Sequence, residues 1–357
     1  MIRIKVDLPL LFGLLILCSV SLVILYSASG ESDRIIINQG IRMLIAFAVM
    51  FVVAQIRTDT LFRWSPSIFA VGLLLLFLVL LVGHTGKGAQ RWLDLGIIRF
   101  QPSEIMKLAV PMMLAWVLTR NTLPPKKLNL FYALLVLTVP AALILRQPDL
   151  GTTLMILMSG TLIIFLAGFA WRNIGVLLLC GAVSAPFLWQ FLHEYQQRRI
   201  LTLFDPWSDP LGAGYHSIQS MIAIGSGGAQ GKGWGEGSQS QLEFIPERHT
   251  DFIFSVFSEE FGFIGVLMLV MLYLFITGRG LYIAYYTKDT YSRLLAGSLS
   301  MTFFFYVFVN IGMVAGLLPV VGVPLPLISY GGTSMVTLMA GFGILMGIHN
   351  QRNLMSH

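Results

Sequence analysis

The chain has 357 residues, of which 56% are hydrophobic and only 11% are charged. Soluble domains are about 45–50% apolar and about 25% charged, so this composition excludes an ordinary soluble protein and indicates an integral membrane protein. The formal net charge of +6 is modest, and the absence of a basic arm or stripe argues against nucleic acid as a partner. Cys18 and Cys180 lie inside apolar runs, so we expect buried thiols rather than a disulfide or a metal pair.

Ten apolar runs predict ten transmembrane helices. We place them at 8–28, 37–56, 66–83, 104–119, 130–145, 153–169, 174–192, 251–277, 292–316 and 335–349. No small-residue cleavage site follows the first run, so we expect no cleavable signal peptide. The predicted fold is an all-α polytopic membrane protein, with residues 1–357 forming one transmembrane domain.

The basic residues predict the orientation of these helices. If the N-terminus is cytoplasmic, the short connections carry twelve basic residues inside and three outside, in agreement with the positive-inside rule. An even number of helices then places both termini in the cytoplasm. The longest connection, residues 193–250 between helices 7 and 8, becomes a large loop on the outer face.

Three connections on that outer face combine glycine and proline with apolar residues: 86–104, 193–250 and 319–334. Glycine and proline at membrane depth are tolerated where the backbone is buried in protein or lines a wet cavity. We therefore expect re-entrant or interfacial segments around an outward-opening vestibule. The glycine-rich stretch GSGGAQGKGWGEG matches neither common phosphate-binding motif, and we interpret it as a flexible loop.

The predicted fourth helix begins QPSEIMK and carries Glu104 and Lys107. The two are three residues apart, so they share a helix face and can pair. Pro102, Ser103 and Glu104 would also suit a simple helix start. Lys107 favours a functional interpretation, because an ammonium one turn inside an apolar helix normally faces a cavity or a counter-charge.

The second charged cluster, ERHTDFIF, contains Glu247, Arg248, His249 and Asp251 where the predicted eighth helix begins. Asp251 could cap this helix together with Thr250. Alternatively, a carboxylate held in place at a partly desolvated helix mouth suits a general base.

Other ionisable groups are weaker candidates. Asp149, in QPDLGT, is either the N-cap of the sixth helix or a partner for Lys107 or Arg99. Arg198, Arg199 and Arg248 bracket the outer loop at headgroup depth, which suits a phosphate-bearing lipid. The histidines of the loop are scattered, so no structural zinc site is expected; a divalent cation could assist, but no ligand set is visible.

Seven motifs together resemble the SEDS family (shape, elongation, division and sporulation). They are KGAQRWLDLG, RFQPSEIMK, QPDLGT, DPLGAGYHSIQS, AIGSGG, PERHTDFIF and NIGMVAGLLPVVGVPLPLISYGG. The resemblance covers nearly the whole chain and is greater to members of the elongation machinery than to those of division. It implies a peptidoglycan glycosyltransferase that polymerises lipid II on the outer face of the inner membrane, in partnership with a class B penicillin-binding protein.

The resemblance also assigns roles to residues. The family's essential aspartate matches Asp251, and the Glu and Lys of its QPSExxK motif match Glu104 and Lys107. Asp251 would act as general base, while cations neutralise the lipid-diphosphate leaving group. We rank these cations with Lys107 and Arg248 first, and complete the expected substrate-binding set as follows: Arg91, Arg99, Arg198, Arg199, His249 and Asp149.

Two other functions are open. A lipid II flippase would also need charged residues in its helices, but the charges gather toward one face and no repeat symmetry is visible. A non-catalytic scaffold for the penicillin-binding protein would leave Lys107 and the Asp251 cluster without a role. Incubation of pure protein with lipid II would separate the three functions, because only the enzyme forms glycan polymer.

Overall fold

The computed structural model describes residues 6–86, 89–94, 99–120, 123–169, 201–203, 205–210, 214–242, 244–245 and 247–354, with isolated positions between 170 and 213. Nine of the ten predicted membrane helices have a counterpart in these residues. They are α1 (Leu8–Ala28), α2 (Asp33–Ala54), α3 (Thr58–Val82), α4 (Pro102–Thr119), α5 (Lys127–Arg146), α6 (Leu150–Leu166), α11 (Ile253–Tyr286), α12 (Thr290–Val314) and α13 (Thr333–Leu354). The predicted seventh helix, 174–192, falls almost wholly outside the described residues, as does Cys180.

The helix boundaries follow local capping chemistry. α1 matches its predicted range, because Asp7 caps it by accepting a hydrogen bond from the N–H of Leu10. α3 begins eight residues earlier than predicted, since Pro66 lies inside the helix rather than at its start. Cys18 is a buried free thiol, as expected.

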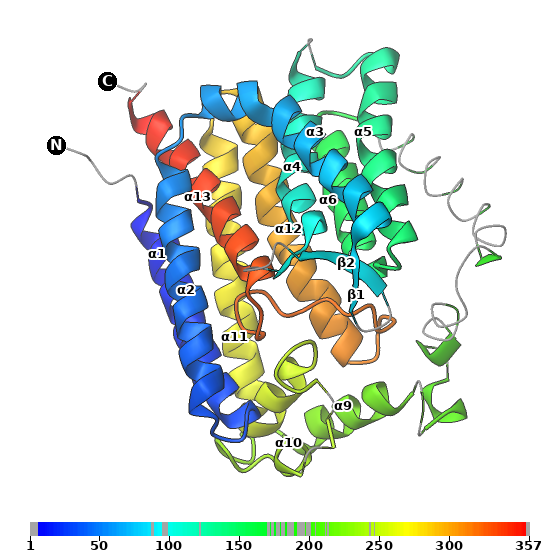
Figure 1. Ribbon diagram of the computed structural model, residues 1–357. Coiled ribbons are helices and arrows are strands. Elements are labelled where there is room, and N and C mark those ends of the chain that lie inside the picture. The colour runs from blue at the N-terminus through cyan, green and yellow to red at the C-terminus, as the bar shows by residue number, and fades with distance from the viewer. Residues whose placement is uncertain are drawn as a thin grey trace.

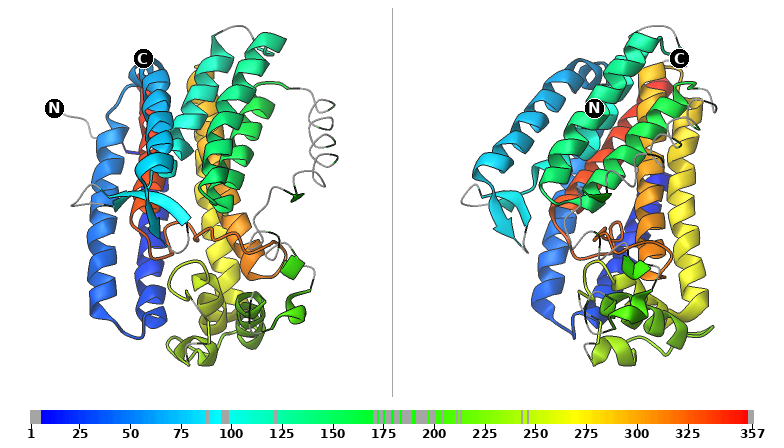
Figure 2. Two further views of the ribbon diagram at one scale, coloured as in Figure 1. Left: turned by 45° about the vertical axis from the view of Figure 1, so that its right-hand side comes forward. Right: turned by 90° about the vertical axis from the view of Figure 1, so that its right-hand side faces the viewer.

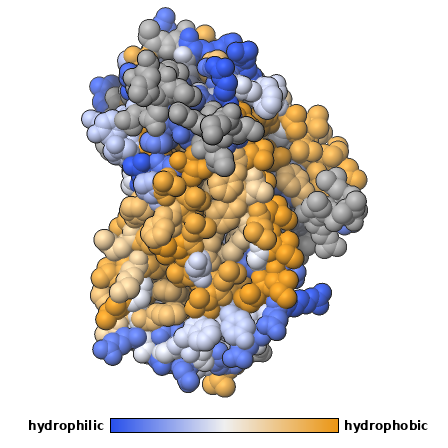
Figure 3. Space-filling view, turned by 90° about the vertical axis from the view of Figure 1, so that its left-hand side faces the viewer, coloured by the Kyte–Doolittle hydropathy of each residue, from blue (hydrophilic) through white to orange (hydrophobic). Residues whose placement is uncertain are grey.

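The chain is a membrane-spanning protein. Among the described residues, six helices are long and apolar enough to cross a membrane: α1, α2, α3, α5, α11 and α12. The helices lie side by side along one direction (Figures 1 and 2). A broad apolar band covers the face shown in Figure 3 and ends at hydrophilic caps above and below, as a bilayer requires. α1 begins and α13 ends at the same end of the bundle (Figure 1), which agrees with an even number of crossings.

A small antiparallel sheet interrupts the helical fold in the first of the three glycine-containing segments. Its strands are β1 (His84–Gly86), β2 (Ala89–Asp94) and β3 (Arg99–Phe100), in the order β1-β2-β3. β1 pairs with β2, and Leu93 of β2 lies opposite Phe100 of β3. The sheet lies part-way along the bundle rather than at its end (Figure 1), so it brings polar side chains to membrane depth just before α4.

The described part of the connection 193–250, which we predicted as the outer loop, forms a cap at the opposite end of the bundle from the start of α1. It includes α9 (Tyr215–Ser226), which lies across that end, and the short α10 (Ser238–Gln241) (Figure 1). α9 packs against α11. A helix crosswise to the bundle at its end is the arrangement expected of an interfacial segment.

The interpretation of the glycine-rich stretch as a flexible loop is wrong, because this stretch fills a break in α11. Gly262 has φ 62° and ψ −165°, values that only glycine adopts readily. The N–H groups of Phe263 and Ile264 donate instead to the carbonyls of Gly228 and Ala229, at 2.9 and 3.1 Å. In the opposite direction, the N–H of Lys232 in the loop donates to the carbonyl of Glu259 at 3.0 Å.

A buried carboxylate fastens the same loop to α11. Glu259 is fully buried, and its Oε1 accepts from Lys232 Nζ at 2.7 Å and from the Gln239 N–H at 2.9 Å. Its Oε2 accepts from the Ser240 N–H at 3.2 Å. Glu259 therefore holds the outer loop and does not join the Asp251 cluster in the site described below.

Candidate active site

A cavity of about 290 Å³ lies where β2, the starts of α4, α6 and α13, and the segments 247–251 and 322–334 meet. It therefore lies among all three of the segments predicted to surround a vestibule. The described acidic and basic side chains that line it are Arg91, Glu104, Lys107, Asp149, Glu247 and Asp251.

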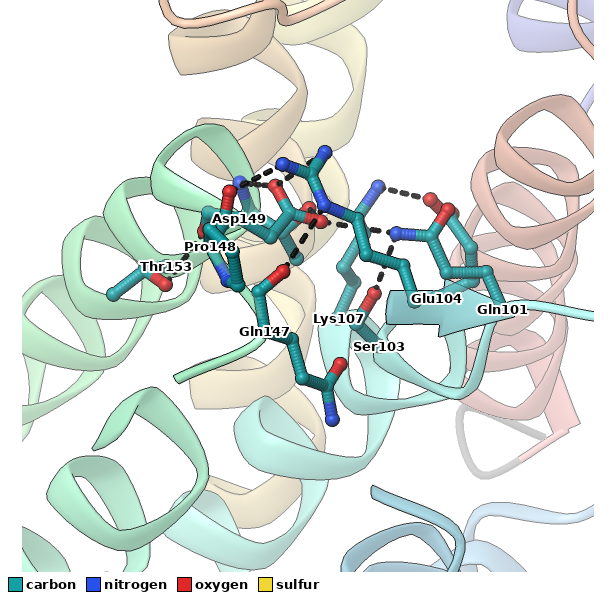
Figure 4. Close-up of polar contacts among 10 residues, drawn as sticks. Gln101, Ser103, Glu104, Lys107, Gln147, Pro148, Asp149 and Thr153 are labelled. Carbon is teal, nitrogen blue, oxygen red and sulfur yellow. Dashed lines mark hydrogen bonds and ion pairs between the residues drawn. The ribbon is translucent and has the colours of Figure 1, made fainter. Parts of the chain in front are cut away.

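The first pair in the cavity is Glu104 and Lys107, on successive turns of α4. Lys107 Nζ lies 2.6 Å from Glu104 Oε1, and the two side chains are only 10% and 6% exposed. The predicted pairing is confirmed (Figure 4). Tyr306 of α12 adds its ring 5.2 Å from the ammonium. A buried ammonium with a carboxylate partner stays charged where an unpaired one would not.

Asp149 is a helix cap, as the sequence allowed, and it also contacts polar side chains of the cavity. It is the N-cap of α6, and its Oδ1 accepts from the Thr152 N–H at 3.1 Å. Its other oxygen accepts from Gln101 Nε2 at 3.0 Å, while Arg91 Nη1 lies 3.9 Å from Oδ1 (Figure 4). The described partners are thus Gln101 and Arg91, and no bond from Lys107 to Asp149 is found among the described residues. The expected pairing with Arg99 stays a prediction, because the Arg99 side chain lies outside the described residues.

The side chain of Arg91, on β2, is held by hydrogen bonds to the turn between α5 and α6. Its Nε donates to the carbonyl of Gln147 at 3.1 Å, and its Nη2 donates to the carbonyl of Pro148. The side chain of Gln147 in turn reaches α3, where Nε2 donates to the carbonyl of Leu76 at 3.0 Å. These bonds place the guanidinium at one wall of the cavity, with Asp149 beside it.

Asp251 reaches the cavity from the turn before α11. That helix begins at Ile253 with Phe252 as its N-cap, so Asp251 precedes the cap position rather than occupying it. Its carbonyl accepts from Asn310 Nδ2 at 2.9 Å. A Cβ at Gly322, where φ is 71°, would lie 3.4 Å from Asp251 Oδ2. The carboxylate therefore lies directly beside the backbone of the segment that joins α12 to α13.

The residues around Asp251 are fixed to the same segment. Ser329 Oγ donates to the carbonyl of Thr250 at 2.6 Å, and the Tyr330 N–H donates to the carbonyl of His249 at 2.8 Å. Asn310 Nδ2 also donates to the carbonyl of Val323 at 2.7 Å. Such a framework fixes the backbone of the turn that carries the carboxylate, and a catalytic group requires a fixed position. Sequence reasoning missed Asn310 and Ser329, because short polar residues in apolar helices and loops carry no distinctive spacing.

The structure separates some predicted residues from the cavity. Arg248 donates to the carbonyl of Ser240 in the outer loop, and the His249 ring lies 6.2 Å from that of Tyr330; neither is among the described residues that line the cavity. Arg198 and Arg199 lie outside the described residues.

One cation near the cavity was not singled out from the sequence. Arg42, on α2, places its guanidinium carbon 4.4 Å from the centre of the Tyr330 ring, and Tyr330 lines the cavity. The available signal was an arginine in the middle of an apolar helix, which is costly unless it faces protein or water.

Within the described part of the chain, no three His, Cys, Asp or Glu side chains gather as metal ligands would. Two carboxylates of the cavity are instead engaged within the protein: Glu104 by Lys107, and Asp149 by Gln101 and the Thr152 N–H.

Comparison with known proteins identifies relatives of this chain. The family model described as "Cell cycle protein" (FtsW, RodA and SpoVE) matches residues 1–354. The peptidoglycan glycosyltransferase MrdB of Escherichia coli K12 is 50% identical over 355 residues, which cover 99% of this chain and 96% of the relative. MrdB of Helicobacter pylori J99 is 38% identical over 91% of this chain and 86% of its own length.

Solved structures agree with these sequence relatives. A chain from a peptidoglycan synthase complex, described as coordinating polymerization and crosslinking, superposes with a TM-score of 0.85 at 31% identity, covering 97% of this chain and 98% of its own. The rod shape determining protein RodA of Thermus thermophilus superposes with a TM-score of 0.74 at 29% identity, covering 97% of each chain. The match along almost the whole sequence and the shared helical fold show that the chain belongs to the FtsW, RodA and SpoVE family of cell cycle proteins, the SEDS family.

Proposed function

We infer that this chain is a peptidoglycan glycosyltransferase that polymerises lipid II into β-1,4-linked glycan strands. The observation that carries this inference is the joint presence of Asp251 and the ion-paired Lys107 on one polar cavity. The relatives named peptidoglycan glycosyltransferase support it, because they cover nearly the whole chain.

In the proposed reaction, Asp251 is the general base. The 4-hydroxyl of GlcNAc on one lipid II attacks C1 of the MurNAc at the end of the growing strand, which is attached to lipid diphosphate. Asp251 accepts the hydroxyl proton, the bond from C1 to the diphosphate oxygen breaks, and the α-linked donor becomes a β-1,4 linkage. The bonds from Asn310, Ser329 and Tyr330 to the Asp251 turn support this role, because they hold the carboxylate in place.

The leaving group explains why the site needs cations rather than a second acid. A glycosidase must protonate a poor leaving alkoxide, whereas a diphosphate leaves readily once its charge is neutralised. Lys107 and Arg91 line the cavity and are our first candidates for this task. Arg248 falls in rank, because its guanidinium is bonded to the outer loop. A divalent cation bound mainly by the substrate's phosphates is also part of the proposal; loss of activity with a chelator would support it.

The proposed setting is the inner membrane, with both termini in the cytoplasm and the cavity open to the periplasm. The distribution of basic residues in the short connections supports this orientation. A class B penicillin-binding protein of the elongation machinery is the proposed partner. The structural similarity to a chain of a peptidoglycan synthase complex supports such a partnership.

The test is polymerisation of lipid II by purified protein, with and without that partner. Asp251→Asn should abolish glycan polymer while the protein remains folded by thermal unfolding and size-exclusion chromatography. Asp33→Asn is a matched control, because Asp33 is an exposed carboxylate at the start of α2. Normal polymerisation by Asp251→Asn would refute the assignment of the base. Translocation of labelled lipid II across liposomes without new glycosidic bonds would favour the flippase instead.

A further inference from the structure

Arg42 is an arginine in the middle of a membrane helix, and no described residue is its anionic partner. It is the tenth residue of the 22-residue α2, which has a mean hydropathy high enough to span a bilayer. Its side chain is half-buried, and its guanidinium contacts the Tyr330 ring. Across the residues that the structure describes, no hydrogen bond or ion pair of Arg42 is found. An unpaired guanidinium at membrane depth is costly, and such residues commonly mark ligand sites.

Among the described residues, three other cations at or near the cavity are already engaged. Lys107 is paired with Glu104, Arg91 is bonded to two carbonyls near Asp149, and Arg248 is bonded to Ser240. Arg42 therefore differs from these three cations, because no described residue engages its N–H groups and they are available to a ligand.

The charge of the cavity creates a need for such a cation. Its described lining holds two cations against four carboxylates. A diphosphate adds further negative charge and would be repelled by this balance unless an additional cation faces it. Arginine suits this task, because its planar fork of N–H donors matches phosphate geometry.

The segment beside Arg42 that lines the cavity contains two glycines, which present no side chain there. A Cβ at Gly332 would lie 3.4 Å from Arg42 Nε, and a Cβ at Gly331 would meet no atom within 4 Å. Gly331 and Gly332 both line the cavity, as do Thr333 and Ser334 in the first turn of α13. Gln39, also on α2, is fully buried and donates from Nε2 to the carbonyl of Ser329 at 3.4 Å. α2 and the glycine segment are therefore fixed beside one another, with the Arg42 side chain against Gly332 and open space at Gly331.

The same stretch of α2 also faces the membrane. Ile41, Leu44 and Ile45 are exposed large apolar side chains on the turn that carries Arg42. A ligand that meets this turn would therefore find an apolar surface for a hydrocarbon chain and a guanidinium for an anionic head. This combination is the chemistry of a phosphate-bearing lipid.

We propose that Arg42 and the glycine segment Gly331–Gly332 form an entry site where the diphosphate of a polyprenyl-linked substrate is bound as it passes from the bilayer into the cavity. The proposal rests on the proposed function for the identity of that substrate. It places Arg42 as a binding residue that contacts the diphosphate, with Tyr330 holding the guanidinium through the face of its ring.

The experiment uses the full chain in nanodiscs. Equilibrium binding of undecaprenyl diphosphate is measured by native mass spectrometry for the wild type, Arg42→Gln, Arg42→Lys and the control Arg34→Gln. Arg34 is an exposed arginine in the first turn of the same helix, so this control makes the same charge change. A second measurement follows the rate of lipid II polymerisation against lipid II concentration.

Arg42→Gln should weaken binding of undecaprenyl diphosphate about tenfold or more, as expected for loss of charge-assisted hydrogen bonds, and should raise KM. Arg42→Lys should bind with intermediate affinity, and Arg34→Gln should match the wild type. Wild-type binding by Arg42→Gln would overturn the proposal. If Arg42→Gln does not fold, the comparison of Arg42→Lys with the wild type decides in the same way.

A further arm separates a lipid from a free phosphate compound. Inorganic pyrophosphate should compete poorly, because it lacks the chain that α2 receives; equal Arg42-dependent affinity for pyrophosphate would refute entry from the bilayer. Failure of the proposed function would look different. In that case the wild type would make no polymer although undecaprenyl diphosphate still bound in an Arg42-dependent manner.

Discussion

Replacement of Gly262 by alanine should strongly destabilise the protein and displace the turn that carries Asp251. The backbone at Gly262 has φ 62° and ψ −165°, which costs a non-glycine residue about 1–3 kcal/mol. A Cβ there would lie 2.2 Å from the Gly231 nitrogen and 2.8 Å from the Ala229 carbonyl oxygen. Because these are backbone atoms, side-chain rotation cannot relieve the contact, and overpacking adds about 1–3 kcal/mol. The combined loss should therefore be about 3 kcal/mol or more.

The same helix supplies a matched control. A Cβ at Gly278 would meet no atom within 4 Å, and alanine is favoured over glycine in a helix interior by about 1 kcal/mol. Gly278→Ala should therefore leave the thermal unfolding midpoint unchanged or raise it, whereas Gly262→Ala should lower it by several degrees in detergent. Polymerisation by Gly262→Ala should also fall, because the break fixes the segment from Asp251 to Phe261 relative to the rest of α11. Equal midpoints for the two variants would show that the break is not required, and our account of how Asp251 is positioned would fail.

Three further predictions concern ionisable groups. Glu104→Gln and Lys107→Met should each destabilise the protein by about 3 kcal/mol, since each leaves a buried charge unpaired. The double variant should be destabilised by less than the sum of the two single variants. Additive losses in a double-mutant cycle of unfolding would contradict a direct pair. Asp149→Asn should retain stability, because Asn also caps helices well, while Asp149→Ala should lose about 1 kcal/mol of stability. Both variants should lose polymerase activity, because both remove the charge beside Arg91. Full activity of both variants would exclude a role for the Arg91 contact in the reaction. Burial opposes ionisation of Asp7, but hydrogen bonds and the charge of Arg279 outweigh it and hold the pKa of Asp7 below its ordinary value of 3.8. The stabilisation is therefore complete above that value and is lost as pH falls through the lower folded pKa. The difference in unfolding midpoint between Asp7→Asn and wild type should be large at pH 7 and shrink in acid. A difference that does not change with pH would contradict this linkage.

Much of the helical architecture could be predicted from the sequence, because a bilayer imposes long apolar runs that are visible without any alignment. The pairing of Glu104 with Lys107 was also predictable, because side chains three positions apart on a helix lie on the same face. The break in α11 was not predictable, because its cause is a loop more than twenty residues earlier that supplies the missing backbone partners. The same loop appeared flexible in the sequence, since its glycines give no sign of what they contact.

The candidate site divides in a similar way. Asp251, Glu104, Lys107, Asp149 and Arg91 were selected from local chemistry and motif resemblance, and all of them line one cavity. The sequence by itself determined a membrane-spanning helical protein and which ionisable groups were too costly to be incidental, because the cost of charge in an apolar helix depends only on local composition. Only the tertiary structure decided which cations remain available, because ion pairing depends on partners far away in the chain. It assigned Arg248 to the outer loop and left Arg42 without an anionic partner among the described residues.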